Sequence, residues 1–173
     1  PNANNLHRVV MFRDDADKVE DLVPFSTYDS SDPEDLWKWL EAYEENTGGQ
    51  VMAFPHNGNL SNGLMFDDRR MNGKRIDIDY AERRMRWEPL YEVTQMKGDG
   101  ETHPAFSPND EFADYYTWDR GNFGTEFKSP DMLPREYARQ ALARGLVYAE
   151  EIGVNPFKFG LIGSSDSHTS LAT

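Results

Sequence analysis

Apolar residues recur along the chain in short runs separated by polar stretches, and the runs predict alternating helices and strands. The clearest helix begins at Asp32, a good N-cap residue, has Pro33 at its first helical position and ends at Gly48. The same spacing predicts helices over residues 77–87 and over about 134–151. Three helices of ordinary length are therefore expected.

Between these helices, four short apolar runs predict strands. Helices alternate with the strands, which is typical of α/β units with parallel strands. Residues 96–132 have no clear periodicity, but their many aromatic residues indicate an ordered, packed irregular insertion. No internal repeat is visible. The predicted strands are Arg8–Phe12, Gln50–Pro55, Pro89–Gln95 and Phe157–Gly163.

The length of 173 residues fits a single domain, spanning 1–173, or a fragment of one. The chain begins at Pro1 rather than Met and stops soon after its last predicted strand, so we expect an excerpt from a longer protein. Its compartment is not indicated. No apolar run reaches 18 residues, so no transmembrane helix is expected.

The charge and the residue types narrow the possible partners. A net charge of -13, from 31 acidic and 18 basic residues, disfavours nucleic acid and anionic membranes, and we expect a small-molecule substrate instead. The chain contains no Cys. Any metal ion must therefore be held by His and carboxylate side chains.

Metal-binding residue types stand at or near the ends of three predicted strands. His56 follows the first of these strands, Glu92 lies on the second, and Asp166 and His168 follow the third. Ends of parallel strands meet at one edge of a sheet or barrel. In extended backbone, residues two apart point to the same side, so we expect Asp166 and His168 to face one metal centre. Each residue alone fits an ordinary packing role, and only the combination favours metal binding.

Five further polar residues have weaker claims to a role. His103 lies in a flexible acidic stretch and is a candidate ligand, general acid or substrate contact, or simply a loop histidine. Asn57 and Asn59 are candidates for substrate binding or for supporting the neighbouring histidine, although both also suit a plain turn. Arg69 and Arg70 are candidate phosphate-binding residues, against the alternative of a solvated loop paired with nearby aspartates.

Three motifs carry a resemblance to a known family. Residues Phe54–Asn59, Tyr91–Val93 and Phe159–Thr169 together resemble a family of uncharacterised bacterial proteins related to the PHP (polymerase and histidinol phosphatase) superfamily. The resemblance covers about residues 20–173. It implies a partial, distorted (β/α)7-type barrel with parallel strands that holds several divalent ions and hydrolyses phosphoesters.

The resemblance also implies roles for individual residues. His56 and Glu92 resemble mid-barrel metal ligands. Asp166 and His168 resemble the terminal Asp-x-His pair, which is expected to bind metal and to take part in catalysis. The implied cofactors are Mn, Fe or Zn ions that activate a hydroxide. The superfamily's His-x-His pair is absent from this sequence and would precede Pro1. A missing N-terminal part of the same domain is therefore an expected partner.

Three alternatives remain open from the sequence. An amidohydrolase-like enzyme that cleaves C–N or C–O bonds would use similar ligands. A non-catalytic binding module would recognise a partner or a carbohydrate through residues 96–132. A serine nucleophile near His168 is a weaker alternative, because no Gly-x-Ser-x-Gly motif is present.

Overall fold

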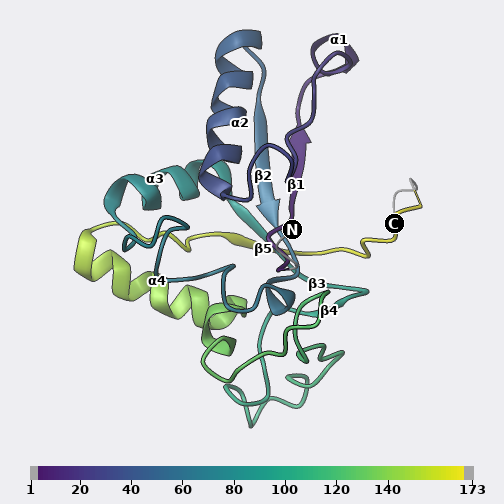
Figure 1. Cartoon of the computed structure of the whole chain (residues 1–173). Coiled ribbons are helices and arrows are strands. Elements are labelled where there is room, and N and C mark those ends of the chain that lie inside the picture. Colours follow the sequence, from purple (N-terminus) through teal and green to yellow (C-terminus); the bar gives the residue numbers. More distant parts are fainter. Residues whose placement is uncertain (1–3, 170–173) are drawn as a thin grey trace.

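Two small sheets organise residues 4–169, the part of the chain that this computed structural model describes (Figure 1). The first sheet pairs β1 (Arg8–Phe12) with β2 (Val51–Pro55) in antiparallel orientation. The second has the order β4 (Gly98–Asp99), β3 (Leu90–Gln95), β5 (Gly160–Gly163). β3 is antiparallel to β4 and parallel to β5. The fold is therefore mixed α/β, as the alternating pattern predicted.

The three predicted helices are all present. The Asp32 side chain accepts a hydrogen bond from the Glu34 amide, and Gly48 ends the helix in the left-handed conformation with φ 63°. The last helix begins four residues later than predicted, because a short 3-10 turn precedes it. No helix within residues 4–169 is long and apolar enough to span a membrane. The helical elements are α1 (Ala16–Val19), α2 (Pro33–Thr47), η1 (Gly58–Leu60), α3 (Ile78–Trp87), η2 (Leu133–Arg135) and α4 (Ala138–Ile152).

The prediction of parallel strands is confirmed for β3 and β5 and is wrong for β1 and β2. In the described part of the chain β3 and β5 are the one parallel pair of strands, and the sheets do not close into a barrel. The reason is an extra pass of the chain. Residues 20–32 bring it back beside the start of β1 before α2 begins, so β2 starts next to the end of β1 (Figure 1).

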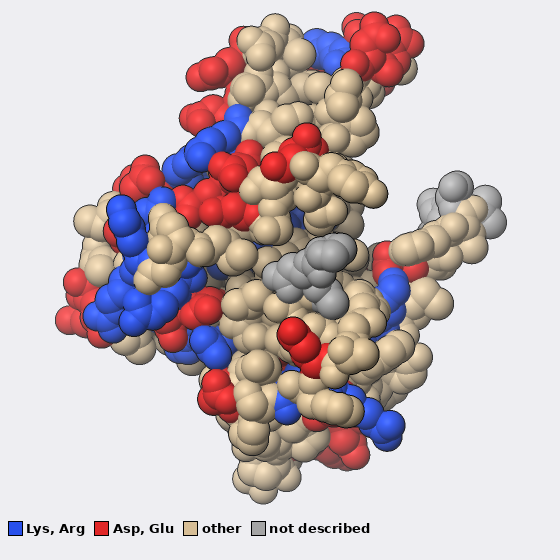
Figure 2. Space-filling view, viewed as in Figure 1, with Lys and Arg blue, Asp and Glu red and all other residues tan. Residues whose placement is uncertain are grey.

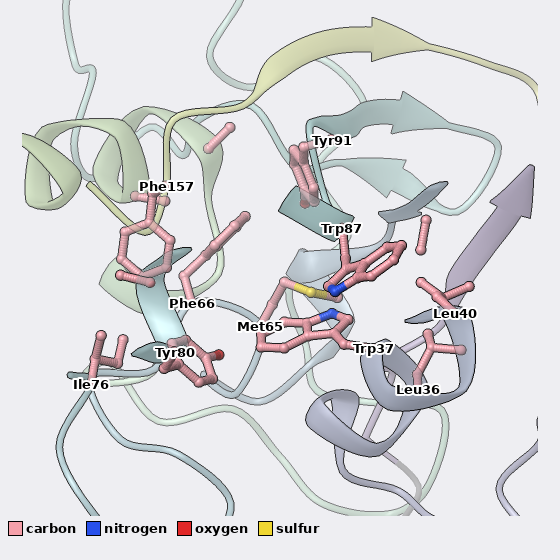
Figure 3. Packing of buried hydrophobic residues seen from close by; sticks show 14 of the residues in the cluster. Leu36, Trp37, Leu40, Met65, Phe66, Ile76, Tyr80, Trp87, Tyr91 and Phe157 are labelled. Carbon is pink, nitrogen blue, oxygen red and sulfur yellow. The ribbon is translucent and has the colours of Figure 1, made fainter. Parts of the chain in front are cut away.

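The hydrophobic core lies between α2, α3 and the two sheets. Figure 3 shows Trp37, Met65 and Trp87 close together, with Phe66 and Phe157 at the other side of the cluster. Trp37, Tyr91 and Phe157 are completely buried. Each buried side chain of this size stabilises the fold by about 1.5–3 kcal/mol relative to an exposed one. Burial of Tyr91 in this core therefore fixes the position of β3, and with it Glu92, the residue that follows Tyr91 in the strand.

A charged residue is buried beside this core. Glu88 follows α3 and accepts hydrogen bonds from Arg8 Nε at 2.9 Å and from Trp37 Nε1 at 3.0 Å, and Arg84 Nε lies 3.4 Å from its second oxygen. Burial raises the pKa of Glu88, but the two guanidinium groups outweigh that effect and hold the pKa below its ordinary value. The network ties β1 to α2 and α3.

A long excursion leaves the sheet after β4. Residues 100–132, all of them described, form turns and bends without a helix or strand. The two ends of the excursion are joined by backbone hydrogen bonds, from Ala138 N to Gly100 O at 2.9 Å and from Arg139 N to Glu101 O at 3.0 Å. The chain thus returns to the point from which it departed.

Candidate functional site

The end of β2 lies beside the middle of β3. A single parallel bridge pairs His56 with Glu92, and it joins the two sheets. His56 Nδ1 lies 4.0 Å from Glu92 Oε1, and both side chains are largely buried. Because side chains alternate along a strand, Tyr91 enters the core while Glu92 faces the other side of β3. The sequence prediction that these strand ends bring His56 and Glu92 together is confirmed.

A glutamine amide orients the histidine. Gln95 Oε1 accepts a hydrogen bond from the Lys97 amide at 2.9 Å, so its Nε2 faces Asn57 Oδ1 at 2.8 Å and His56 Nδ1 at 3.0 Å. His56 therefore presents its Nδ1 lone pair to a donor. Burial, followed by the positive charges of neighbouring groups, lowers the pKa of His56 to about 4. The imidazole is neutral near pH 7, which is the form that binds metal ions.

A second histidine, His7, lies against the first. The two rings are 5.9 Å apart between centroids and tilted by 44°, and the His56 amide donates to His7 O at 3.3 Å. Sequence reasoning missed His7. With parallel strands, the residue before Arg8 would stand at the far edge from His56, whereas antiparallel pairing places the two side by side. Its position directly before an apolar run was the available signal.

Glu92 has one oxygen without a partner. Its Oε1 is buried and has no hydrogen-bond donor among the described residues. Burial raises the pKa of Glu92, and hydrogen bonds from Gln95 and Ser164 together with the charge of Lys97 partly offset that effect. An unsatisfied carboxylate oxygen beside a neutral imidazole is suited to contact a cation.

The segment after β5 continues alongside β3. Ser164 N donates to Thr94 O at 3.2 Å, and Met96 N donates to Ser165 O at 3.4 Å. These two hydrogen bonds extend the parallel pairing beyond Gly163. They place Asp166 beside the turn between β3 and β4, at the end of β3 where Gln95 lies.

The side chains of the Asp-x-His segment interact with each other. His168 Nε2 lies 2.9 Å from Asp166 Oδ1, and the ammonium group of Lys97 forms an ion pair with the other oxygen of Asp166. The prediction of an extended segment is wrong, because Asp166 and His168 both have φ 51° in the left-handed region. In this conformation the Asp166 carboxylate contacts both Lys97 and His168.

The arrangement fits half of a metal site. Two ligands of one ion, each about 2.0–2.2 Å from it, are at most about 4.3 Å apart. The distance of 4.0 Å between His56 Nδ1 and Glu92 Oε1 lies within that limit. Within residues 4–169, however, no group of three or more His, Asp or Glu side chains is placed to hold an ion. Asp166, the other candidate carboxylate ligand, is paired with Lys97.

His103 has a different set of partners. Its Nε2 lies 2.6 Å from Asp119 Oδ2, and its Nδ1 accepts a hydrogen bond from the Ala105 amide at 3.1 Å. Its ring packs against Tyr137 with the centroids 5.4 Å apart. All these contacts lie within the excursion or at the start of α4. His103 therefore holds the excursion together, and its contacts within residues 4–169 do not include His56 or Glu92.

The two candidate asparagines, Asn57 and Asn59, form hydrogen bonds with residues that surround the candidate site. Asn57 accepts the hydrogen bond from Gln95 described above. Asn59 is completely buried, and its Nδ2 donates to Lys97 O at 3.1 Å and to Trp118 O at 3.0 Å. Asn59 thus joins the loop after β2 to the turn after β3 and to the excursion. Its amide nitrogen is thus bound by backbone carbonyls, whereas its buried Oδ1 has no hydrogen-bond partner among the described residues.

The candidate arginines lie in a loop before α3. Arg70 binds Glu34 at 2.8 Å and Asp77 at 2.8 Å, which ties the loop to the first turns of α2 and α3. The Arg69 guanidinium donates to Gly73 O at 2.9 Å. Figure 2 shows basic side chains gathered around this part of the surface and acidic ones over α1. The contacts of Arg69 and Arg70 therefore agree with the alternative of a solvated loop whose charges are paired.

Taken together, the fold and these contacts define a mixed α/β domain with a histidine–carboxylate cluster where the ends of its strands meet. The chain belongs to the family described as "Protein of unknown function (DUF3604)", whose model matches residues 1–173. Comparison with curated proteins and with solved structures finds no match. The expected membership in a family of unknown function is confirmed, over the whole chain.

Proposed function

We propose that the protein is a metal-dependent hydrolase of phosphoesters, with His56, Glu92, Asp166 and His168 as its divalent-metal ligands. The observation that carries the proposal is the juxtaposition of His56 and Glu92, with nitrogen and oxygen 4.0 Å apart. A neutral imidazole and a carboxylate are the side chains that bind Mn, Fe and Zn in proteins that lack cysteine ligands.

The unpartnered oxygen of Glu92 supports a cation at this position. A buried acceptor without a donor costs about 1–3 kcal/mol. A cation held by Glu92 and His56 would remove that cost. Asp166 would join them through the oxygen now paired with Lys97, and His168, already in contact with Asp166, would be the fourth ligand. The ion is thus expected to complete a site that the protein alone leaves half formed.

The chemistry follows from the ligand set. A divalent ion bound there supplies an activated water and neutralises part of the charge of a phosphoryl group. Gln95 Nε2 lies 3.0 Å from His56 Nδ1, and an ion bound at that nitrogen would take the place of the amide. Glu92 lies on β3 directly after Tyr91, which is buried in the core. Ligands on strands are held more accurately than ligands on loops, which favours catalysis.

The substrate class rests on the motifs. The resemblance of residues 54–59, 91–93 and 159–169 to the PHP superfamily supports phosphoesters, and with them a distorted (β/α)7-type barrel to which β2, β3 and β5 would contribute. A C–N or C–O bond hydrolase would use the same ligands. A panel of phosphomonoesters, amides and esters, assayed with Mn, Fe and Zn, distinguishes these reactions.

A second candidate function is favoured by the exposed aromatic residues of the excursion. Phe112, Tyr115 and Phe127 have exposed fractions of 70%, 69% and 84%. Exposed aromatic side chains are suited to stack on a carbohydrate or to bind a protein partner. A non-catalytic binding module would keep this binding after metal removal, which a chelation experiment can measure.

Metal binding and activity together test the proposed enzyme. We expect stoichiometric Mn, Fe or Zn in the purified protein and Mn-dependent hydrolysis of p-nitrophenyl phosphate. His56→Ala, Glu92→Gln and Asp166→Asn should each lower both. His103→Ala is the matched control, because His103 contacts a separate set of residues. Absence of bound metal, or full activity in Asp166→Asn and His168→Ala, would contradict the proposal.

A further inference from the structure

Lys97 occupies a fixed position at the candidate site. It lies in the turn between β3 and β4, and both of its backbone groups are held by buried side chains. Its amide donates to Gln95 Oε1 at 2.9 Å, and its carbonyl accepts from Asn59 Nδ2 at 3.1 Å. Because Gln95 also binds His56, the turn that carries Lys97 belongs to the same hydrogen-bond network as the candidate ligand.

The ammonium group of Lys97 is held among acidic and imidazole groups. It pairs with Asp166, and the exposed fractions of the two side chains are only 24% and 15%. After burial, which is the larger effect, its charge also lowers the pKa of His7. The same charge acts on His56 and Glu92. Lys97 thus supplies a positive charge where the candidate ligands converge.

We propose that Lys97 binds the negatively charged oxygens of the substrate, and that Asp166 holds its ammonium group until a divalent ion takes that carboxylate. This inference rests on the proposed function. A lysine ammonium group has three donors and binds phosphate as a compact point charge. A divalent ion attracts a carboxylate more strongly than an ammonium group does, so an ion held by Asp166 would free the Lys97 ammonium group to bind the substrate.

Two other basic side chains, those of Arg70 and Arg8, are already paired with carboxylates. Arg70 is bound to Glu34 and Asp77, and Arg8 is bound to Glu88 inside the protein. Lys97 differs from them because its partner is itself a candidate metal ligand. Its ion pair is therefore one that a metal ion bound by Asp166 would break.

Inorganic phosphate binding to the metal-free protein tests the role of Lys97 without a metal ion. Isothermal titration calorimetry should give about fivefold tighter binding for Asp166→Asn than for the wild type, because an ion pair of this exposure is then broken. The double variant that combines Asp166→Asn with Lys97→Met should lose that gain in phosphate affinity. Lys158→Met, which changes an exposed lysine before β5, is the control and should leave phosphate binding unchanged. The proposal is overturned if Asp166→Asn leaves the phosphate affinity unchanged. It is also overturned if Lys97→Met and Lys158→Met lower the phosphate affinity equally.

Mn²⁺ binding tests the competition at Asp166. Lys97→Met should bind Mn²⁺ about fivefold more tightly than the wild type, because it lacks the internal cation that competes for the carboxylate. Lys97→Gln provides the same test if the Met variant does not fold. Unchanged or weaker Mn²⁺ binding in the variant overturns the inference. If the wild type binds no Mn²⁺ while the phosphate results agree, the proposed enzyme fails and the holding of Lys97 by Asp166 stands.

Discussion

The side-chain amide of Gln95 faces the ring of His56, with Nε2 3.0 Å from Nδ1. The amide is oriented by two other hydrogen bonds, one to Asn57 and one from the Lys97 backbone. Gln95 therefore occupies the lone pair of a candidate ligand while the nearby Glu92 oxygen lacks a donor. A metal ion between His56 and Glu92 has to displace this amide.

The first prediction concerns this amide. Gln95→Glu replaces a donor by a carboxylate beside His56 and Glu92, and it should tighten Mn²⁺ binding about tenfold, the scale on which groups next to ligands act. Without metal, the two adjacent carboxylates repel each other and should lower the melting temperature. Calorimetry and thermal melts with and without Mn²⁺ measure both effects. Gln140→Glu, on α4, is the control, and an equal gain in both variants would contradict a local cause.

The second prediction concerns the buried charge network. Glu88→Gln leaves Arg8 and Arg84 without their counter-charge and should lower the free energy of unfolding at pH 7 by about 3–5 kcal/mol. Glu82→Gln, exposed on the same helix, should change it by less than about 0.5 kcal/mol. Urea denaturation measures both, and similar values for the two variants would show that the network adds no stability.

The pH dependence of this network has a definite sign. The pKa of Glu88 is held below its ordinary value in the folded state, so its charge stabilises the fold fully above the unfolded-state pKa of about 4.3. That contribution is lost as the pH falls through the lower, folded-state pKa. The stability difference between wild type and Glu88→Gln should therefore shrink below about pH 4. A difference that grows on acidification would mean that the pKa is raised instead.

The third prediction concerns the loop that follows His56. A Cβ atom on Gly58 would collide with the carbonyl oxygen of Glu136 and lie 2.6 Å from the Tyr91 hydroxyl group. Gly58→Ala should therefore displace the loop and cost more than about 2 kcal/mol of unfolding free energy. Gly73→Ala is the control, since Gly73 has φ 82° but open space around it, and backbone strain alone costs about 1 kcal/mol there. Equal losses in denaturation experiments would rule out the close contact.

The fourth prediction concerns the attachment of the excursion. Asn59→Ala removes two hydrogen bonds, to Lys97 O and Trp118 O, and should loosen residues 100–132 more than the rest of the chain. Limited proteolysis should cleave the excursion faster, and hydrogen exchange should rise there while α2 stays protected. Asn109→Ala, on the exposed surface of the excursion, should have neither effect. Uniform loosening of the whole chain would indicate a loss of global stability instead.

Local patterns predicted the helices and strands well because each element carries its own signals. Asp32 and Gly48 bound α2 as expected, and the apolar run before His56 forms β2. The direction of β1 relative to β2 was mispredicted because it depends on the path of residues 20–32, which carry no periodic signal. That error also hid His7 from the candidate site.

The side-chain contacts of the site were less predictable than its location. His56 and Glu92 lie side by side at β3 as their strand positions suggested, and the hydrogen bonds of Ser164 and Ser165 run the segment before Asp166 along the same strand. Lys97 and Gln95 have no motif, and they reach the site because a two-residue turn and buried asparagines orient them. The charge of Arg70 suggested phosphate binding, but its side chain is bound by Glu34, which is far away in the sequence.

The joined ends of the excursion have an evolutionary consequence. Since Gly100 and Ala138 are hydrogen-bonded neighbours, the chain between them can lengthen, shorten or be exchanged without moving β3 or α4. Relatives of this protein can thus acquire new surface loops beside an unchanged framework. Differences in excursion length among homologues should accordingly track differences in what each one recognises.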